Sequence, residues 1–461
     1  MRSAFPFYLP LHLRMTISEK DRQYVWHPFT PQKNMQAPLP IAGGKGSLLI
    51  DENGKEYIDA ISSWWVTLHG HAHPYIAEKL YRQALQLEQV IFAGFTHAPA
   101  VELAERLLQI LPGGFSKIFY SDNGSTSTEV AIKMAIQYWW NKQLTVDSRP
   151  LTVDCRQSAV DRRPLTGKRK ILAFNNSYHG DTFGAMSVSD RSVFTLAFHN
   201  HLFEVIFIDI PSEENITELK NIVHAHAGET AAFIYEALVQ GAGGMKMYNP
   251  DIFCELLNEV KQHDIICIAD EVMTGFGRTG KFFASEYMNT MPDIICLSKG
   301  LTGGTMALGV TACTDKIYNA FVDDDKLKTF FHGHSFTANP LACTAALASL
   351  DLLMDDMCIE KIGWIETSNK NFAKELQPSA DAGKIKNIRT TGTILAFEIN
   401  EGNDEYLNNI SSSVTAAAMD AGVYIRPLGN TVYIMPPYCI TESQLRKVYD
   451  VILEICRQRE K

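Results

Sequence analysis

Three groups that could react with a ligand or bind it follow short apolar runs of the chain. Asp270 follows the run IICIA, Lys299 follows IICL after one serine, and Gly124-Ser125 lie just beyond KIFY at the start of a helical pattern. An amine can form a Schiff base with an aldehyde, a carboxylate can keep a ring nitrogen protonated, and a helix N-terminus can hold a phosphate. Because ligands of open parallel sheets bind beyond the carboxyl ends of the strands, we expect these groups to meet at one sheet edge.

Together the three parts match what pyridoxal 5'-phosphate requires. Lys299 is predicted to bind the cofactor's aldehyde, Asp270 to pair with its pyridine nitrogen, and Gly124-Ser125 to hold its phosphate. The protonated ring then accepts the electrons released when a substrate Cα loses its proton, and the freed Lys299 amine shuttles that proton. A single lysine after a strand is usually a surface residue, so the prediction depends on the joint occurrence at three strand ends.

Two other patterns suggest different chemistry. Gly275–Gly280 fits G-x-G-x-x-G, the fingerprint of dinucleotide binding, but Asp270–Thr274 separate it from the preceding run, whereas the fingerprint turns directly at the strand end. A nicotinamide-dependent dehydrogenase therefore stays as an alternative from another class. The alternating histidines of segment 69–73 (HGHAH) lie in a sequence typical of a turn, so we expect packing roles for them and no metal.

The elements that must position these residues can be predicted from hydrophobic patterns. Between about residues 100 and 310, helical patterns alternate with runs that are apolar at nearly every position, as strands covered on both faces must be. This alternation predicts an α/β fold with a mostly parallel sheet in a large domain. The six predicted strands are Lys117–Tyr120, Lys170–Phe174, Val205–Ile208, Ala231–Tyr235, Ile265–Ala269 and Ile294–Leu297.

The last third of the chain has a different pattern, which predicts a smaller α+β domain. A capping box, Thr441-x-x-Gln444, opens its C-terminal helix. The predicted strands are Ile394–Ile399, Val423–Arg426 and Thr431–Met435, and the apolar stripe of the helix comprises Leu445, Val448, Ile452 and Cys456. The polar segment 141–170, between a helix and a strand, is predicted to be a surface insertion.

Composition excludes several classes of protein. The chain has 461 residues, of which 46% are hydrophobic, enough for a large buried core. The 42 Lys and Arg against 52 Asp and Glu argue against nucleic acid or a membrane surface as a partner. Nine scattered cysteines predict reduced thiols in a cytoplasmic protein, and no apolar run approaches the ~18 residues of a membrane span. We interpret residues 1–19 as an extension with a mis-assigned start codon, because Met15 opens a more ordinary polar start.

Asp270–Gly280, followed by Ser298-Lys299-Gly300, resembles the signature of class III, fold-type I aminotransferases. Within that class, several segments resemble the members that convert 8-amino-7-oxononanoate to 7,8-diaminononanoate in biotin synthesis. They are Trp26-His-Pro-Phe29, Ser62-Ser-Trp64-Trp65, Gly94-Phe-Thr96-His97-Ala-Pro99, Tyr178-His-Gly-Asp-Thr-Phe-Gly184, Gln240-Gly-Ala-Gly-Gly-Met245, His332-Gly-His-Ser-Phe336 and Arg426-Pro-Leu-Gly429. The resemblance extends from about residue 24 to 450.

The resemblance implies an organisation and a set of site residues. It implies a large cofactor-binding domain (66–339), a small domain from both chain ends (20–65 plus 340–461), and a homodimer with shared active sites. Tyr178 is then expected over the cofactor ring as a catalytic residue, and Trp64 along the pocket. Gly333 is expected beside the substrate, and Arg426 is expected to bind a keto-acid carboxylate through two hydrogen bonds. The pair His334-Ser335 is expected to reach the phosphate from the neighbouring subunit.

Two departures concern the amino donor. Phe29 stands where well-known members carry a tyrosine that contacts the substrate, and His334-Ser335 replaces the familiar Pro-Thr pair. Both changes resemble relatives that use lysine as donor, whereas the pair Trp64-Trp65 points to S-adenosylmethionine. The expected function is ping-pong transamination of 8-amino-7-oxononanoate to 7,8-diaminononanoate, with S-adenosylmethionine as the expected amino donor and lysine as the alternative donor. Another class III ω-amino-acid transaminase is the alternative within the family.

Overall fold

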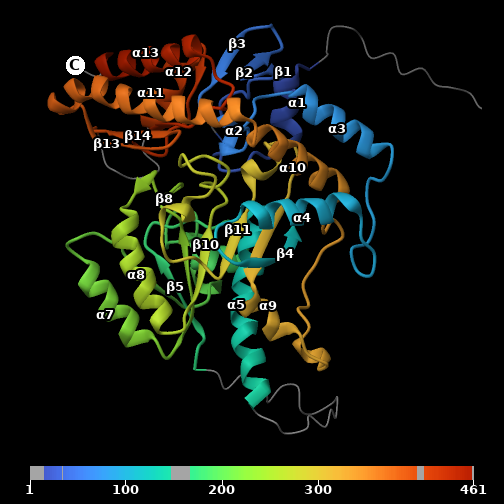
Figure 1. The fold of residues 1–461 in the computed structure, drawn as a ribbon. Coiled ribbons are helices and arrows are strands. Elements are labelled where there is room, and N and C mark those ends of the chain that lie inside the picture. Colours follow the sequence, from blue (N-terminus) through green and yellow to red (C-terminus); the bar gives the residue numbers. More distant parts are fainter. Residues whose placement is uncertain (1–14, 34, 147–166, 402–409, 459–461) are drawn as a thin grey trace, which may run out of the picture.

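The computed structural model describes residues 15–33, 35–146, 167–401 and 410–458. Its centre is a seven-stranded sheet with the strand order β4-β12-β11-β10-β7-β5-β6 (Figure 1). The strands are β4 (Phe115–Ser121), β5 (Lys170–Phe174), β6 (Val205–Ile208), β7 (Thr230–Glu236), β10 (Ile266–Asp270), β11 (Ile294–Leu297) and β12 (Gly309–Thr314).

Strand β12 alone runs against the other six, because it pairs antiparallel with both β11 and β4. The remaining neighbours pair in parallel. All six predicted strands are present, so the prediction of an α/β fold with a mostly parallel sheet is confirmed. Strand β12 is missing from the prediction, because its sequence, GVTACT, contains no run of large apolar side chains.

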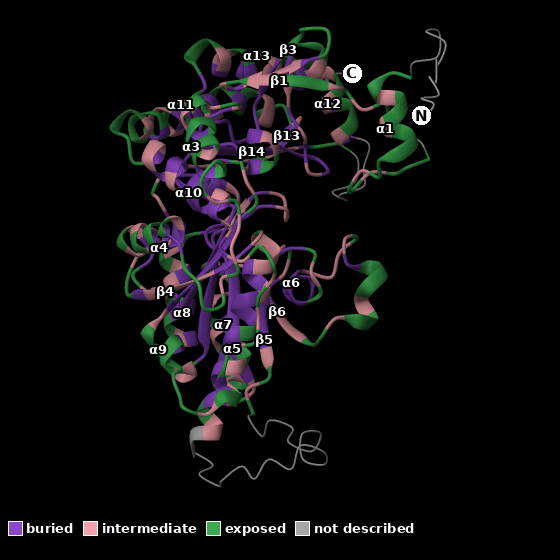
Figure 2. Cartoon of the chain, turned by 90° about the vertical axis from the view of Figure 1, so that its right-hand side faces the viewer, coloured by how far each residue is buried: buried purple, intermediate pink, exposed green. Residues whose placement is uncertain are grey.

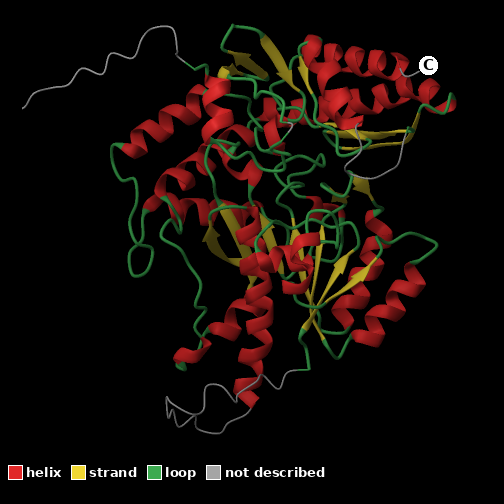
Figure 3. Cartoon of the chain, turned by 180° about the vertical axis from the view of Figure 1, so that it is seen from behind, coloured by secondary structure: helices red, strands yellow, loops and turns green. Residues whose placement is uncertain are grey.

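Helices cover both faces of this sheet (Figures 2 and 3). On one face α5 (Gly124–Val146) packs side chains such as Met134 onto the β10 residues Ile266 and Ile268. The opposite face, with Cys267 and Ala269, belongs to a second core that includes α4 (Ala98–Ile110), α7 (Ile216–His226) and α8 (Pro250–Gln262). Successive residues of a strand point to opposite faces, so a run covered on both sides is apolar throughout.

The two ends of the described chain come together beside this sheet, blue and red at the top of Figure 1. One sheet there has the order β1-β2-β3-β15, and its strand β15 pairs in parallel with β3; the other has the order β13-β14-β16. The strands are β1 (Ile41–Lys45), β2 (Leu48–Asp51), β3 (Glu56–Asp59), β13 (Ile385–Thr391), β14 (Ile394–Ile399), β15 (Val423–Tyr424) and β16 (Thr431–Ile434). The helices of this part are α1 (Ile17–Tyr24), α2 (Ser62–Trp65), α3 (Pro74–Ala84), α10 (Pro340–Leu353), α11 (Asp356–Asp381), α12 (Ile410–Asp420) and α13 (Glu442–Gln458).

The predicted elements of the last third are confirmed, and β1, β2, β3 and β13 are additional. The capping box of α13 is formed, since Gln444 N donates to Thr441 Oγ1 over 3.3 Å and Thr441 N donates to Gln444 Oε1 over 2.9 Å. The predicted apolar stripe of this helix is buried. The boundaries of the two predicted domains stay a prediction.

The predicted insertion at 141–170 needs correction at both edges. Residues 141–146 continue helix α5, where Asn141 is fully buried, and residue 170 already belongs to β5. Residues 147–166 lie outside the described residues, as do residues 1–14 of the predicted extension. Within the described part of the chain, no helix combines the length and apolar character needed to cross a membrane.

Candidate active site

A cavity of about 790 Å³ lies where several strands of the large sheet end. Its wall includes Glu236 at the end of β7, Asp270 at the end of β10, and Lys299 two residues after β11. Residues 122–125, which follow β4, also line it. The remaining wall includes Trp64, Trp65 and Leu428, which belong to the part of the molecule built from the two chain ends. The structure therefore brings Asp270, Lys299 and Gly124-Ser125 together on one cavity at this edge of the sheet.

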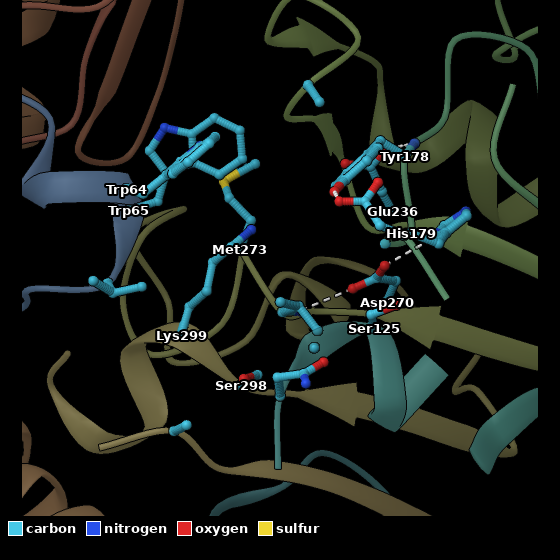
Figure 4. Close-up of a pocket in the computed structure, with 18 of the residues that line it drawn as sticks. Trp64, Trp65, Ser125, Tyr178, His179, Glu236, Asp270, Met273, Ser298 and Lys299 are labelled. Carbon is cyan, nitrogen blue, oxygen red and sulfur yellow. Dashed lines mark hydrogen bonds and ion pairs between the residues drawn. The ribbon is translucent and has the colours of Figure 1, made fainter. Parts of the chain in front are cut away.

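Asp270 is a buried carboxylate held in one orientation. Its Oδ2 accepts a hydrogen bond from His179 Nδ1 over 2.7 Å, and its Oδ1 accepts one from Val272 N over 3.0 Å (Figure 4). His179 is itself buried, and its second nitrogen, Nε2, has no partner among the described residues. The hydrogen bond from the imidazole thus fixes the orientation of the carboxylate, which faces the cavity.

A second buried carboxylate, Glu236, stands opposite Asp270 in the register of β7 and β10. It accepts hydrogen bonds from Tyr178 N over 2.9 Å and Gly241 N over 2.8 Å. The pKa of Glu236 is raised to about 7, mainly by burial; Asp270 adds to this rise, whereas His179 and the two backbone N–H groups oppose it. Sequence reasoning missed Glu236, although it follows the predicted strand Ala231–Tyr235 by the same rule that found Asp270.

Lys299 reaches into the cavity from the short helix η3 (Lys299–Thr302) with a positive φ of 42°. Its Nζ lies 4.4 Å from the centre of the Trp65 ring (Figure 4). Burial lowers the pKa of Lys299 to about 8, while Asp270 and Glu236 oppose this shift. A pKa near neutral lets the amine act either as a nucleophile or as a proton carrier.

The start of helix α5 forms a narrow cradle. Asn123 Oδ1 accepts from Thr126 N over 3.0 Å, which leaves the N–H groups of Gly124 and Ser125 as the first of the helix, with no acceptor inside it. A Cβ at Gly124 would lie only 2.6 Å from Val272 Cγ1. The hydroxyl of Ser125 is 2.9 Å from that of Thr182, so the serine side chain is also fixed.

One wall of the cavity is aromatic. The Phe29 ring lies 5.5 Å from Trp64 and 5.9 Å from Phe194, and Phe194 lies 6.2 Å from Tyr178. The Tyr178 hydroxyl donates to Asp181 Oδ2 over 2.9 Å, and burial raises the pKa of this phenol well above its usual value. Phe29 thus contributes a ring without a hydroxyl to this wall.

The segment that carries Trp64 and Trp65 has an unusual backbone, with positive φ at Ser62, Ser63 and Trp65. Asp59 holds it: its Oδ2 accepts from Ser63 N over 2.6 Å, and its Oδ1 accepts from Ile61 N over 3.2 Å. Such conformations are costly for residues other than glycine and persist where the surroundings fix them. The backbone turn that Asp59 holds therefore fixes the directions in which the Trp64 and Trp65 side chains point.

Four predicted site residues lie outside this cavity. Arg426 stacks its guanidinium over Trp64, 4.9 Å from the ring centre, and lines a separate cavity of about 390 Å³ behind that ring. Gly333 and Ser335 are exposed and His334 is half-buried, and this chain does not bring them to Lys299.

The two other sequence patterns have structural explanations. Gly275–Gly280 forms turns, and the next element is the short helix η2 (Ala284–Tyr287), so no α-helix begins where a dinucleotide loop needs one. Of the three histidines, His69 faces Ser349 at 3.1 Å and His71 faces Asp59 at 2.9 Å, so their rings serve different partners.

These residues fit pyridoxal phosphate as judged from the site itself. A buried amine, a carboxylate held by an imidazole, and a helix start without room for a Cβ all open onto one cavity. The three groups are those that an aldehyde, a pyridine nitrogen and a phosphate require.

Comparison with known proteins places this site in a family. The family model "Aminotransferase class-III" matches residues 29–456. The chain is similar to adenosylmethionine-8-amino-7-oxononanoate aminotransferase of Synechococcus elongatus, with 44% identity over 94% of this chain and 98% of that protein. It is also similar to the protein of that name from Geobacter sulfurreducens, with 37% identity over 96% and 97% of the two chains.

A solved structure gives the same result. The crystal structure of adenosylmethionine-8-amino-7-oxononanoate aminotransferase from Methanocaldococcus jannaschii superposes with a TM-score of 0.86 and 33% identity, over 96% of this chain and 99% of that one. The family model spans nearly the whole chain and includes every residue of the cavity wall. The chain therefore belongs to the class III aminotransferases.

Proposed function

We propose that this aminotransferase converts 8-amino-7-oxononanoate to 7,8-diaminononanoate, a step of biotin synthesis, with S-adenosylmethionine as amino donor and pyridoxal phosphate as cofactor. The full-length similarity to relatives whose names state the keto acid and the donor carries this proposal. The convergence of Lys299, Asp270 and the start of α5 on one cavity supports the cofactor. Lysine as donor stays a second candidate, because Phe29 and His334-Ser335 resemble the relatives that use it.

Lys299, Asp270 and Gly124-Ser125 are the residues that would hold the cofactor. When bound, pyridoxal phosphate supplies a ring that accepts the electrons left behind by a departing Cα proton. Asp270, fixed by His179 and by Val272 N, keeps a negative charge where a ring nitrogen needs one. The N–H groups at the start of α5 and the Ser125 hydroxyl offer donors to a phosphate.

Lys299 is the proposed proton carrier. With a pKa of about 8, about a tenth of its amine is neutral at pH 7, and this part can accept a proton from a substrate carbon. Trp65 lies against the amine and excludes water from one side. Donor and keto acid are proposed to use the site in turn, by a ping-pong mechanism.

The aromatic wall and Arg426 are proposed to select the keto acid. The rings of Phe29, Trp64 and Tyr178 suit an apolar carbon chain. The Arg426 guanidinium, stacked on Trp64 beyond that wall, is proposed to bind the carboxylate at the far end of the chain. Gly333 is proposed to contact the same substrate from the partner subunit.

A homodimer with shared active sites is part of the proposal. His334 and Ser335 lie outside the cavity of their own chain, and two neighbouring rings, Phe331 and Phe336, are 74% and 63% exposed. Exposed aromatic side chains clustered in one segment are typical of an interaction surface. We propose that this surface meets a second copy, so that His334 and Ser335 of the partner subunit reach the phosphate.

The cofactor assignment can be tested by reduction with borohydride. We expect the purified protein to show the absorbance of a pyridoxal Schiff base, and a reduced protein to carry the pyridoxyl label on the peptide with Lys299. Lys299→Ala should lose both the label and turnover, the latter by about 10²–10⁴-fold or more. A label on a different lysine, or full turnover by Lys299→Ala, would overturn the assignment.

The donor can be tested by adding S-adenosylmethionine and lysine separately to the loaded enzyme. The true donor should bleach the Schiff-base band and, with the keto acid present, support formation of 7,8-diaminononanoate. Bleaching by lysine alone would replace S-adenosylmethionine in the proposal. Bleaching by other ω-amino acids, without any reaction of the keto acid, would indicate another ω-amino-acid transaminase.

A further inference from the structure

Helices α7 and α8, which lie side by side away from the cavity, carry a group of potential metal ligands (Figure 1). The group consists of His224 in the last turn of α7, Glu259 on α8, and His263 at the end of α8. One ligand atom from each lies within 4.8 Å of the others, and no other such group of three occurs in the described residues.

The geometry of the group follows from the packing of the two helices. Glu259 and His263 are one turn apart on α8, and the distance from Glu259 Oε1 to His263 Nε2 is 2.9 Å. The His224 ring faces them from α7, with its centre 5.1 Å from that of His263. One turn before, Lys220 of α7 pairs with Glu255 of α8 at 2.7 Å, so the two helix faces are in register.

We propose that His224, Glu259 and His263 bind a divalent transition-metal ion of the zinc type, which joins α7 to α8. Two imidazoles and a carboxylate form a ligand set that Zn²⁺ uses, and a water molecule takes the fourth position. His224 is exposed and Glu259 and His263 are only half-buried, so solvent and metal have access.

Binding requires a small movement of one side chain. Ligand atoms about 2.0–2.2 Å from a tetrahedral ion lie ~3.3 Å apart, closer than the 4.8 Å limit of this group. The exposed His224 can supply this movement by rotation of its side chain.

The site is separate from the reaction. His263 precedes the amino end of β10, whereas Asp270 lies at the carboxyl end of that strand. The basic groups nearby are already engaged, since Lys220 pairs with Glu255 and Lys168 Nζ donates to the carbonyls of His263 and Asp264. We therefore expect the ion to stabilise the α7–α8 pair and to leave turnover unchanged.

The experiment is a calorimetric titration of Zn²⁺ into the cofactor-loaded full chain without an affinity tag. We expect one equivalent per chain to bind, and the melting temperature to rise with it. His224→Ala and His263→Ala should each weaken this binding by at least ~10-fold, and Glu259→Gln should weaken it while keeping a hydrogen-bonding side chain.

His226→Ala is the matched control. This histidine lies on the same helix and pairs with Glu229 at 2.6 Å, outside the proposed ligand set. The control should bind Zn²⁺ like the unchanged protein, and all variants should keep their turnover without added metal. Absence of binding at micromolar Zn²⁺, or equal affinity in His224→Ala and His226→Ala, would overturn the proposal, whatever the identity of the keto acid.

Discussion

At the scale of single residues, the site separates the tasks of two neighbouring carboxylates. Asp270 is paired with an imidazole, whereas Glu236 is held by two backbone N–H groups and its pKa is raised to about 7 by burial. Asp270 thus has an imidazole as its hydrogen-bond partner, whereas the two backbone N–H groups that bind Glu236 only partly oppose the rise in its pKa that burial causes. This difference suits Asp270 to a cationic ring nitrogen and leaves Glu236 to position the backbone of Tyr178.

The lowered pKa of Lys299 gives a prediction about pH. Only the neutral amine attacks an aldehyde, so cofactor uptake by the cofactor-free protein should accelerate about tenfold per pH unit below about 8 and then level off. Stopped-flow absorbance after mixing with pyridoxal phosphate measures this rate. An unperturbed lysine would keep accelerating to about pH 10, and such a profile would contradict the lowered pKa.

Arg426 gives a second prediction at this scale. Arg426→Ala should raise the KM for the keto acid about 10- to 100-fold, because a charge-assisted hydrogen bond contributes about 1.5–3 kcal/mol. The KM for the donor should change far less, and steady-state kinetics with each substrate varied in turn measures both. Arg82→Ala, which removes an exposed arginine paired with Glu78 on α3, is the control. An equal rise for both substrates would contradict the proposed role.

The positions of Lys299, Asp270 and Gly124 could be predicted from the sequence because each follows a strand of consecutive apolar residues. His179 could not, since its role depends on a buried contact across 91 residues of chain. The position of Arg426 relative to the cavity could not be predicted from the sequence either, because it depends on the orientation of the Trp64 ring. Strand-end rules find residues along the chain, but they do not show which side chains face one another.

At the scale of elements, the helices and strands with a regular pattern of apolar residues could be predicted from the sequence. The parallel strands and helix α13 have uninterrupted apolar runs or stripes, and they were predicted within a residue or two. Strand β12 and the segment Ser62–Trp65 were not, because small residues and positive φ angles are set by tertiary contacts. For the second segment those contacts are to Asp59 and to Met435, whose carbonyl accepts from Ser62 Oγ over 2.7 Å.

The start of α5 gives a prediction for an element. Gly124→Ala should place a methyl group against Val272 and displace the helix start, at a cost of about 1–3 kcal/mol, and thereby weaken cofactor binding. Absorbance titration with pyridoxal phosphate measures the affinity. Gly43→Ala is the control, since a Cβ there meets no atom within 4 Å.

The clash itself can be tested with a second change. Val272→Ala combined with Gly124→Ala should recover part of the lost affinity, because it removes the methyl groups that the new Cβ meets. Additive losses in the double variant would show that overlap with Val272 is not the cause.

At the scale of the whole molecule, subunit mixing tests the shared active site. Lys299→Ala chains and chains with both His334→Ala and Ser335→Ala should each be impaired as homodimers. After joint refolding, each mixed dimer has one site with all three native residues, so about a quarter of all sites should be active. Activity no higher than the mean of the two parents would contradict sharing between subunits.

The pairing of β15 with β3 and the bond from Trp65 Nε1 to the Tyr433 hydroxyl, 2.9 Å long, have a consequence for synthesis on the ribosome. A nascent chain has made Lys299 and Asp270 long before Tyr433 leaves the exit tunnel. Until then, the segment with Trp64 and Trp65 has its contacts with Asp59 but lacks those with Tyr433 and Met435. The wall of the cavity is thus completed late in folding. A chain truncated before Tyr433 would contain Lys299 and Asp270 but would lack the hydrogen bond that holds the Trp65 ring.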